Sequence, residues 1–324
     1  MKILLTGCAG FIGWNTALSF LDTGHEVVGI DDLNDYYDTR LKKWRLDRLT
    51  SCSSFTFKKG DIRDRDFLKK VFSDTCPDAV VNLAARAGVH ASIANPSIYF
   101  ETNVLGNLHL LELCRHHHIQ KYLLASTSSL YAGEKMPFSE SLPVNRPISP
   151  YAASKKGAEA TCYTYHSLFH IDITVLRYFT VYGPAGRPDL SIFKFIKMID
   201  KGETLTVYSD GEQSRDFTYI SDIAEGTRLA TLTHTGFEII NLGGNQPHTL
   251  NYAIALIEEF LGKKATIVHK PMLPTDINAT WADIGKAENL LGWKPHVCFR
   301  EGIQRTVAWY LEHRNFLTTL QFPL

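Results

Sequence analysis

Short apolar runs alternate with amphipathic stretches along the first half of the chain. Residues Lys2–Thr6 form an apolar run that ends at Gly7, and residues 11–23 show helical spacing and stop before Gly24. Further β-rich runs follow at 26–30, 55–57, 79–83, 122–125 and 173–176. Short continuous apolar runs are typical of buried parallel strands. The alternation predicts an α/β fold with a doubly wound parallel sheet.

The pattern changes after Tyr182, where glycines and prolines gather at residues 183–188 before shorter, less regular elements. A chain of 324 residues suits one large α/β domain with a smaller lobe. We expect residues 1–180 to form the large domain and residues 181–324 to form a smaller mixed α/β lobe. The chain can pass from one of these domains to the other more than once.

Composition excludes several classes of function. Lysine plus arginine equals aspartate plus glutamate at 34 each, so no general field attracts nucleic acid. No apolar run approaches the roughly 20 residues of a membrane span, and the first residues lack a signal-peptide pattern. The six cysteines are scattered without a C-x-x-C pair, which favours a reduced, cytoplasmic protein. The adjacent histidines at 116–118 point in different directions on a helix, so no metal site is predicted.

Gly7, Gly10 and Gly13 lie directly between the first predicted strand and the first predicted helix. Glycines there let backbone N–H groups at a helix N-terminus approach a pyrophosphate. Asp31 follows the second strand, where a carboxylate can bind an adenosine ribose and would repel a 2′-phosphate. The combination predicts a Rossmann fold that binds NAD rather than NADP.

Asp61 and Ile62 follow the third predicted strand. They could contact the adenine of the cofactor, or Asp61 could simply cap the next helix. The residues alone leave both alternatives open.

Tyr151 and Lys155 are spaced i, i+4 at the start of a predicted helix, so they share one face. A phenol needs its pKa of about 10 lowered by roughly 3 units, or about 4 kcal/mol, to act as a base near neutrality. Positive charge from Lys155 and from the nicotinamide of NAD⁺ can supply this. The alternative is an ordinary exposed helix face.

Residues 126–129 place hydroxyls at the end of the fifth predicted strand, where open parallel sheets carry their chemistry. Thr127 is then a third catalytic candidate, which would bind the oxygen that Tyr151 deprotonates. Asn103 would organise the site. The alternative for the serines is ordinary loop capping.

Six stretches together resemble the extended short-chain dehydrogenase/reductase family, and specifically its nucleotide-sugar epimerases. They are TGCAGFIG at 6–13, NLAA at 82–85, TSSLY at 127–131, YAASK at 151–155, RYFTVYGP at 177–184 and RDFTYI at 215–220. Within that group the chain is similar to UDP-glucuronate 4-epimerases, which share LNDYYD at 33–38, AGV at 87–89 and GRPD at 186–189.

The resemblance implies an isomerase that epimerises C4 of a UDP-sugar, most simply UDP-glucuronate to UDP-galacturonate, through a 4-keto intermediate with return of the hydride. It implies tightly bound NAD, regenerated each cycle, and a homodimer. The implied cofactor-binding residues are Gly7, Gly10, Phe11, Ile12, Gly13, Asp31, Asp61, Ile62, Leu83, Ala84, Ala85, Asn103, Tyr151, Lys155 and Tyr178. The implied substrate-binding residues are Arg86, Ser128, Ser129, Thr180, Arg187, Arg215 and Asp276.

Arg187 has a chemical reason for its implied role, because a guanidinium fork can grip the C6 carboxylate of a uronic acid. The alternative is a loop arginine paired with Asp189. Three of the positions that depart from the family patterns lie near the expected substrate. Arg86 and His90 stand where glucuronate epimerases usually have glutamine and arginine. Leu273 stands where UDP-galactose 4-epimerases have an arginine for the diphosphate, so Arg215 is expected to carry more of that contact.

Related activities are the main alternatives. Sugar-nucleotide dehydratases and decarboxylases resemble the chain but carry an acidic residue just before the equivalent of Tyr131, where this chain has Ser128 and Ser129. Epimerisation of UDP-glucose or UDP-N-acetylglucosamine is a second alternative. A non-catalytic NAD sensor is a remote one, because a binding protein has no need for Tyr151, Lys155 and Thr127.

Overall fold

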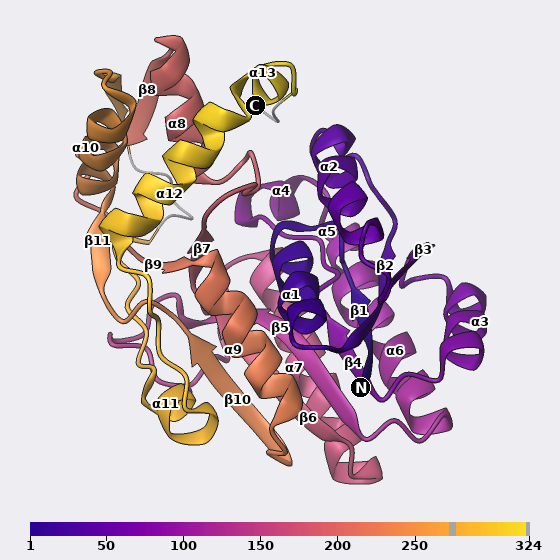
Figure 1. Ribbon diagram of the computed structural model, residues 1–324. Coiled ribbons are helices and arrows are strands. Elements are labelled where there is room, and N and C mark those ends of the chain that lie inside the picture. The colour runs from indigo at the N-terminus through magenta and orange to yellow at the C-terminus, as the bar shows by residue number, and fades with distance from the viewer. Residues whose placement is uncertain (272–276, 322–324) are drawn as a thin grey trace.

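The computed structural model describes residues 1–271 and 277–321, which contain a parallel sheet of seven strands in the order β10-β6-β5-β4-β1-β2-β3 (Figure 1). The strands are β1 (Lys2–Thr6), β2 (Glu26–Asp31), β3 (Phe55–Lys59), β4 (Ala79–Asn82), β5 (Lys121–Thr127), β6 (Asp172–Tyr178) and β10 (Phe237–Leu242). The predicted α/β fold with a doubly wound parallel sheet is confirmed. The predicted strands are present, and most extend by a few residues beyond the apolar runs.

Helices cover both faces of this sheet because its strands are apolar on both sides. Ile3 and Leu5 of β1 belong to one buried cluster and Leu4 to another. The first cluster packs against α1 (Phe11–Asp22), α2 (Thr39–Thr50) and α9 (Ile220–Leu232). The second packs against α3 (Arg65–Thr75), α6 (Asn107–His116) and α7 (Pro150–Phe169). The segments α4 (Val89–Ala94), α5 (Pro96–Phe100) and η1 (Glu101–Gly106, a π-helix) lead into α6.

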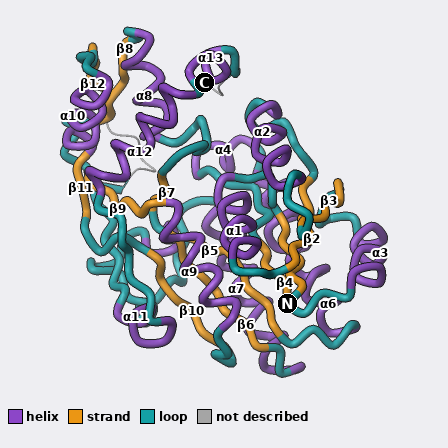
Figure 2. The backbone as a smooth tube through the Cα atoms, viewed as in Figure 1, coloured by secondary structure: helices purple, strands orange, loops and turns teal. Residues whose placement is uncertain are grey.

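The C-terminal part adds smaller sheets and helices beside the end of the large sheet, as Figures 1 and 2 show. Strand β9 (Ser214–Tyr219) pairs in parallel with β7 (Thr180–Tyr182) and antiparallel with β11 (Pro247–Thr249). A separate parallel pair joins β8 (Thr204–Tyr208) to β12 (Thr266–Lys270). The helices are α8 (Ser191–Lys201), α10 (Leu250–Leu261), α11 (Gly285–Leu291), α12 (Phe299–Glu312) and α13 (Arg314–Thr318).

Strand β10 belongs to the C-terminal half of the chain but forms an edge of the large sheet. It pairs in parallel with β6, for example Ile239 opposite Val175. The chain therefore returns to the first layer after it has built part of the second. The division into residues 1–180 and 181–324 remains a prediction.

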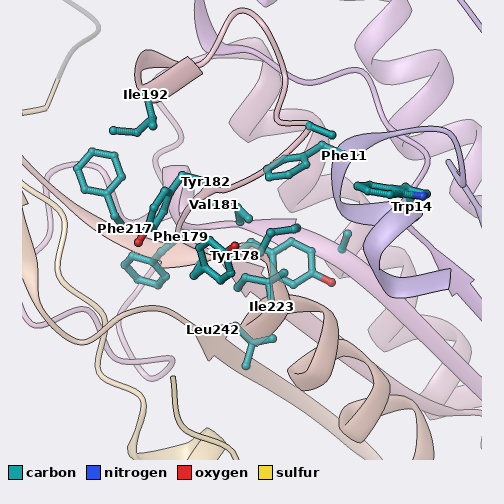
Figure 3. Packing of buried hydrophobic residues seen from close by; sticks show 14 of the residues in the cluster. Phe11, Trp14, Tyr178, Phe179, Val181, Tyr182, Ile192, Phe217, Ile223 and Leu242 are labelled. Atoms are coloured by element: carbon teal, nitrogen blue, oxygen red, sulfur yellow. The ribbon is translucent and has the colours of Figure 1, made fainter. Parts of the chain in front are cut away.

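A continuous aromatic core joins the two parts. Figure 3 shows Phe11 and Trp14 of α1 on one side of this core and Phe217 and Ile192 on the other, with Tyr182 between them. Helix α2 also reaches the C-terminal part, since the rings of Trp44 and Trp309 lie 5.4 Å apart edge to face. None of the helices within the described ranges is long and apolar enough to cross a membrane.

Candidate active site

A cavity of about 360 Å³ opens at the carboxyl ends of the central strands. Strand β1 lies between β2 and β4, so the chain leaves it on one side toward β2 and continues on the other side from β4. Such a reversal of strand order opens a crevice where ligands of parallel sheets bind. Along the chain, its lining residues run from the loop after β1 to the loop after β7.

The glycine loop forms the floor of one end of the cavity. Gly7 has φ of +72°, and a Cβ there would lie 2.8 Å from the Ala84 nitrogen. A Cβ on Gly13 would lie 2.0 Å from the Gly7 carbonyl oxygen. Only glycine fits either position. Helix α1 has no side-chain N-cap, and Phe11 and Ile12 of its first turn line the cavity, so its backbone N–H groups fit a pyrophosphate.

Asp31 lies buried at the end of β2, as predicted. Its Oδ2 accepts from the Ala9 N–H at 3.0 Å and its Oδ1 from the Leu33 N–H at 2.9 Å. Burial raises the pKa of Asp31, and the nearby charge of Lys42 opposes that rise. A carboxylate has about four acceptor positions, so two remain for ribose hydroxyls.

Helix α2 and the segment before it contribute two cavity residues that had no expected role, Lys42 and Tyr37. The Lys42 ammonium lies 3.8 Å from Asp31 and 5.3 Å from the centre of the Tyr37 ring. Both side chains are buried and both line the cavity. Tyr37 lies in the stretch at 33–38 that resembles glucuronate epimerases, which was a signal for it. Lys42 had no such signal, because it is one of several charged residues in a polar helix.

Asp61 and Ile62 both line the cavity beyond the end of β3. Asp61 accepts hydrogen bonds from Arg63 at 2.9 and 2.7 Å, while Asp64 is the residue that caps α3. The helix-cap alternative for Asp61 is therefore wrong. A contact between Asp61 and the adenine stays a prediction.

Helix α7 carries Tyr151 and Lys155 into the same cavity. Its start is fixed by Pro150 in the first turn and by Ser149, whose side chain accepts from the Ala152 N–H at 3.2 Å. Lys155 is 3% exposed, and its Nζ donates to the Ala125 carbonyl at 2.9 Å. The exposed-face alternative is therefore wrong for this pair.

The electrostatics of the pair differ from the prediction in one respect. Burial raises the pKa of the Tyr151 phenol, while a hydrogen bond with Thr127 and the charge of Arg187 lower it. Lys155 is not among these influences, and its ammonium donates to the Ala125 carbonyl. Burial lowers the pKa of Lys155 to about 8, and Glu159 opposes that change.

Thr127 ends β5 and combines both roles that the sequence left open. Its Oγ1 donates to the Ser129 Oγ at 3.0 Å and accepts from the Ser129 N–H at 3.1 Å, which caps a short 3₁₀ helix, η2 (Ser128–Tyr131). Thr127, Ser128 and Ser129 nevertheless all line the cavity. Capping of the loop and a place in the cavity are therefore compatible for these hydroxyls.

Asn103 lies behind the cavity wall and is absent from its described lining. Its amide accepts from the Arg86 N–H at 2.9 Å, and donates to the Arg86 carbonyl at 3.0 Å and to the Ser154 hydroxyl at 2.9 Å. These bonds tie the loop that follows β4 to α7. A direct contact between Asn103 and the cofactor stays a prediction.

One group of the lining residues is basic and polar. Arg187 lines the cavity together with Arg86, Thr180 and Ser129. The Arg187 Nη2 lies 2.5 Å from the Asp189 Oδ2, so the loop pairing is present in addition to the cavity position. The guanidinium also lies 5.7 Å from the centre of the Tyr36 ring.

Of the other predicted residues, some line the cavity and some do not. Leu83, Ala84, Ala85 and Tyr178 line the cavity. Arg215 does not appear in the described lining, and its Nη1 donates to the Ser214 carbonyl at 2.9 Å. Asp276 and Leu273 lie outside the described residues. Those described contain no group of three or more histidine, cysteine or acidic side chains that could hold a metal ion.

The glycine loop and the Tyr151 and Lys155 pair in one cavity define an enzyme of the extended short-chain dehydrogenase/reductase class. Residues 4–306 match the family model described as GDP-mannose 4,6 dehydratase, and the chain belongs to this family.

Full-length relatives share both sequence and fold. The UDP-glucuronate 4-epimerase of Thermodesulfobacterium geofontis is 50% identical over 98% of this chain and 98% of its own. The UDP-glucuronic acid 4-epimerase of Bacillus cereus, solved with UDP-glucuronic acid and NAD, has a TM-score of 0.90 and 38% identity, and the match covers 96% of this chain and 99% of that one. The UDP-glucose 4-epimerase of Thermotoga maritima, solved with UDP-glucose, has a TM-score of 0.88 and 30% identity over 97% and 100%.

Proposed function

We propose that this protein is an NAD-dependent UDP-sugar 4-epimerase that interconverts UDP-glucuronate and UDP-galacturonate. The observation that carries the proposal is that one cavity is lined by the glycine loop, Tyr151 and Arg187 together. A dinucleotide site, a hydroxyl base and a guanidinium for a carboxylate thus share one space. The 50% identical relative supports the same substrate.

The residues at the first end of the cavity fit NAD. The uncapped start of α1 would bind the pyrophosphate, and Asp31 would accept hydrogen bonds from the adenosine ribose. Asp61, Ile62 and Tyr178, together with residues 83–85, would contact the rest of the cofactor. NAD held by these residues would supply the hydride chemistry at C4 of the sugar and would be regenerated in each turnover.

Tyr151 takes the proton of the sugar 4-hydroxyl during oxidation and returns it after the sugar has turned over. Thr127 and Arg187 oppose the rise that burial causes in the pKa of Tyr151, and the positive charge of a bound NAD⁺ would act in the same direction. Lys155 fixes the end of β5 through the Ala125 carbonyl and adds positive charge behind the site. Thr127 and Tyr151 hold the 4-keto sugar by hydrogen bonds.

Arg187 protects the intermediate against loss of its carboxylate. The 4-keto uronate is a β-keto acid, which releases CO₂ when its carboxylate bond aligns with the carbonyl π-system. A bidentate contact from Arg187, with Thr180, Ser128 and Ser129 nearby, would hold the carboxylate out of that alignment. Arg86, Arg215 and Asp276 are proposed to contact other parts of the nucleotide-sugar.

Elimination of water is not proposed, although the family is named after a dehydratase. The segment before Tyr131 presents the hydroxyls of Ser128 and Ser129 to the cavity and no carboxylate. A serine hydroxyl has too high a pKa to act as the acid of an elimination.

We further propose that the protein is a cytoplasmic homodimer. All six cysteines, which lie in the described ranges, carry free thiols. Helix α7 and the neighbouring η1 segment expose Tyr163, Leu168 and Leu105. A symmetric pairing of these helices would bury those side chains.

The test is to incubate the purified protein with UDP-glucuronate, without added NAD, and to follow the sugar C1 and C4 protons by NMR. The proposal requires UDP-galacturonate to appear, with cofactor that was retained through purification. A pentose product would instead identify a decarboxylase. If UDP-glucuronate stays unchanged even with added NAD while UDP-glucose or UDP-N-acetylglucosamine is converted, the substrate assignment is wrong.

A further inference from the structure

Arg45 is a fully buried guanidinium in α2 whose side chain joins two loops distant in sequence. Its Nε and Nη2 donate to the Ala185 carbonyl at 3.1 and 2.7 Å, and Nη2 also donates to the Gly186 carbonyl at 3.3 Å. Its Nη1 donates to the Ala9 carbonyl at 3.0 Å and to the Tyr37 hydroxyl at 2.7 Å. One side chain therefore fixes both loops and a residue of the cavity wall.

Both loops border the cavity, and they lie close enough together for one guanidinium to bond to each. Ala9 lies within the glycine loop, whereas residues 185–186 directly precede Arg187. Ala185 has φ of +54°, a left-handed conformation that costs an alanine energy and persists only when its surroundings hold it. The forked contact from Arg45 to the Ala185 carbonyl supplies such a hold.

The chemistry of Arg45 is unusual for a residue with a purely structural role. Among the described residues, its hydrogen-bond partners are carbonyls and a phenol, and no carboxylate lies within ion-pair distance. Burying a cation without an opposite charge is costly, and apolar side chains often serve stability better. A rigid fork of donors is suited instead to fixing several carbonyls in one geometry.

We propose that Arg45 is a positioning residue that sets the distance between the glycine loop and Arg187, and so decides whether the keto intermediate keeps its carboxylate. The proposal rests on the proposed uronate epimerisation. Arg45 itself touches neither substrate nor cofactor. It acts through the two loops, so its loss displaces Arg187 relative to the hydride acceptor while leaving Arg187 and Tyr151 in the chain.

The test compares Arg45→Met and Arg45→Lys with wild type. The matched control is Arg48→Met, which removes an exposed arginine from the same helix. Each holoenzyme is assayed for melting temperature, bound NAD, kcat and KM with UDP-glucuronate, and the ratio of CO₂ to UDP-galacturonate formed.

For Arg45→Met we expect kcat/KM to fall about tenfold and the CO₂ ratio to rise by a similar factor. Arg45→Lys should lie between it and wild type, and Arg48→Met should match wild type. If Arg45→Met does not fold, Arg45→Lys decides alone. An unchanged CO₂ ratio in a folded Arg45 variant, even with a lower melting temperature, overturns the proposal.

The two proposals fail in different ways. A wild-type protein that leaves UDP-glucuronate unchanged refutes the uronate assignment and gives no product ratio. Arg45 is then judged by the rate at which bound NAD exchanges with labelled NAD. Faster exchange in Arg45→Lys than in Arg48→Met would still support a loop-positioning role, and equal rates would refute it.

Discussion

Arg187 reaches the cavity while paired with Asp189, with Nη2 and Oδ2 only 2.5 Å apart. Each side chain is about one fifth exposed, 21% and 20%. A substrate carboxylate that binds Arg187 must therefore share or displace the carboxylate of Asp189. This competition makes the affinity for a uronic acid adjustable without any change in the catalytic residues.

Replacing Arg187 by alanine should release the intermediate from its constraint. We expect the fraction of turnovers that end in CO₂ and a keto-pentose to rise about tenfold or more, because the carboxylate can then align with the ketone. The measurement is CO₂ release alongside NMR of the sugar products. A variant that releases no more CO₂ than wild type contradicts the protective role.

Asp189→Asn is the informative counterpart of that variant. It keeps the size of the side chain and removes the competing charge, so KM for UDP-glucuronate should fall several-fold and CO₂ release should stay low. KM for UDP-glucose, which has no carboxylate, should not change. Equal shifts for both substrates would show that the loop had merely moved.

Tyr151→Phe should remove the group that moves the proton. We expect kcat to fall by roughly 10²- to 10⁴-fold, the usual contribution of a positioned acid-base group. Bound NAD and melting temperature should remain near wild type, because the ring keeps its contact with Tyr99. Single-turnover reduction of the cofactor measures the step directly, and rapid reduction in the variant would exclude Tyr151 as the base.

Asp31→Asn should weaken the discrimination between NAD and NADP. The negative charge that repels a 2′-phosphate disappears, while Lys42, 3.8 Å away in the same cavity, remains to attract one. We expect the preference for NAD to fall at least tenfold in titrations of the cofactor-free protein. Adding Lys42→Met should abolish any gain in NADP binding, and rejection of NADP by Asp31→Asn would refute the charge explanation.

The buried ammonium of Lys155 predicts a pH dependence of stability. Its pKa is lowered from 10.5 to about 8 in the folded protein, so the unfolded state holds more protons between these values. Stability therefore rises with pH across that window, by about 2 kcal/mol from roughly pH 7.5 to pH 10. Urea unfolding of wild type and Lys155→Met at both pH values measures this contribution. Parallel changes in the two proteins would contradict it.

The site residues that could be predicted from the sequence are those marked by a local pattern. The glycine loop, Asp31 and the Tyr151 pair each stand at the end of a strand or the start of a helix, where spacing alone indicates a site. Lys42 and Arg45 were missed because a charged residue in a polar helix normally faces water. Only the packing of α2 between the glycine loop and the loop before Arg187 turns both side chains inward.

The sequence also could not show which charged group acts on the pKa of Tyr151. An i, i+4 spacing places Tyr151 and Lys155 on one side of α7 but does not say where the flexible lysine ends. The structure directs it to Ala125 on β5, and the charge that lowers the pKa of Tyr151 comes from Arg187 instead. Arg187 lies 36 residues further along the chain.

The position of β10 at the edge of the large sheet has a consequence for how the chain folds. Until residues 237–242 have been synthesised, β6 ends the sheet with unpaired backbone groups on one side, next to apolar Ile173 and Val175. A nascent chain or fragment that stops at residue 180 would therefore expose an unpaired edge strand, which can aggregate with other chains. The large parallel sheet is therefore complete only after residues 237–242 have left the ribosome.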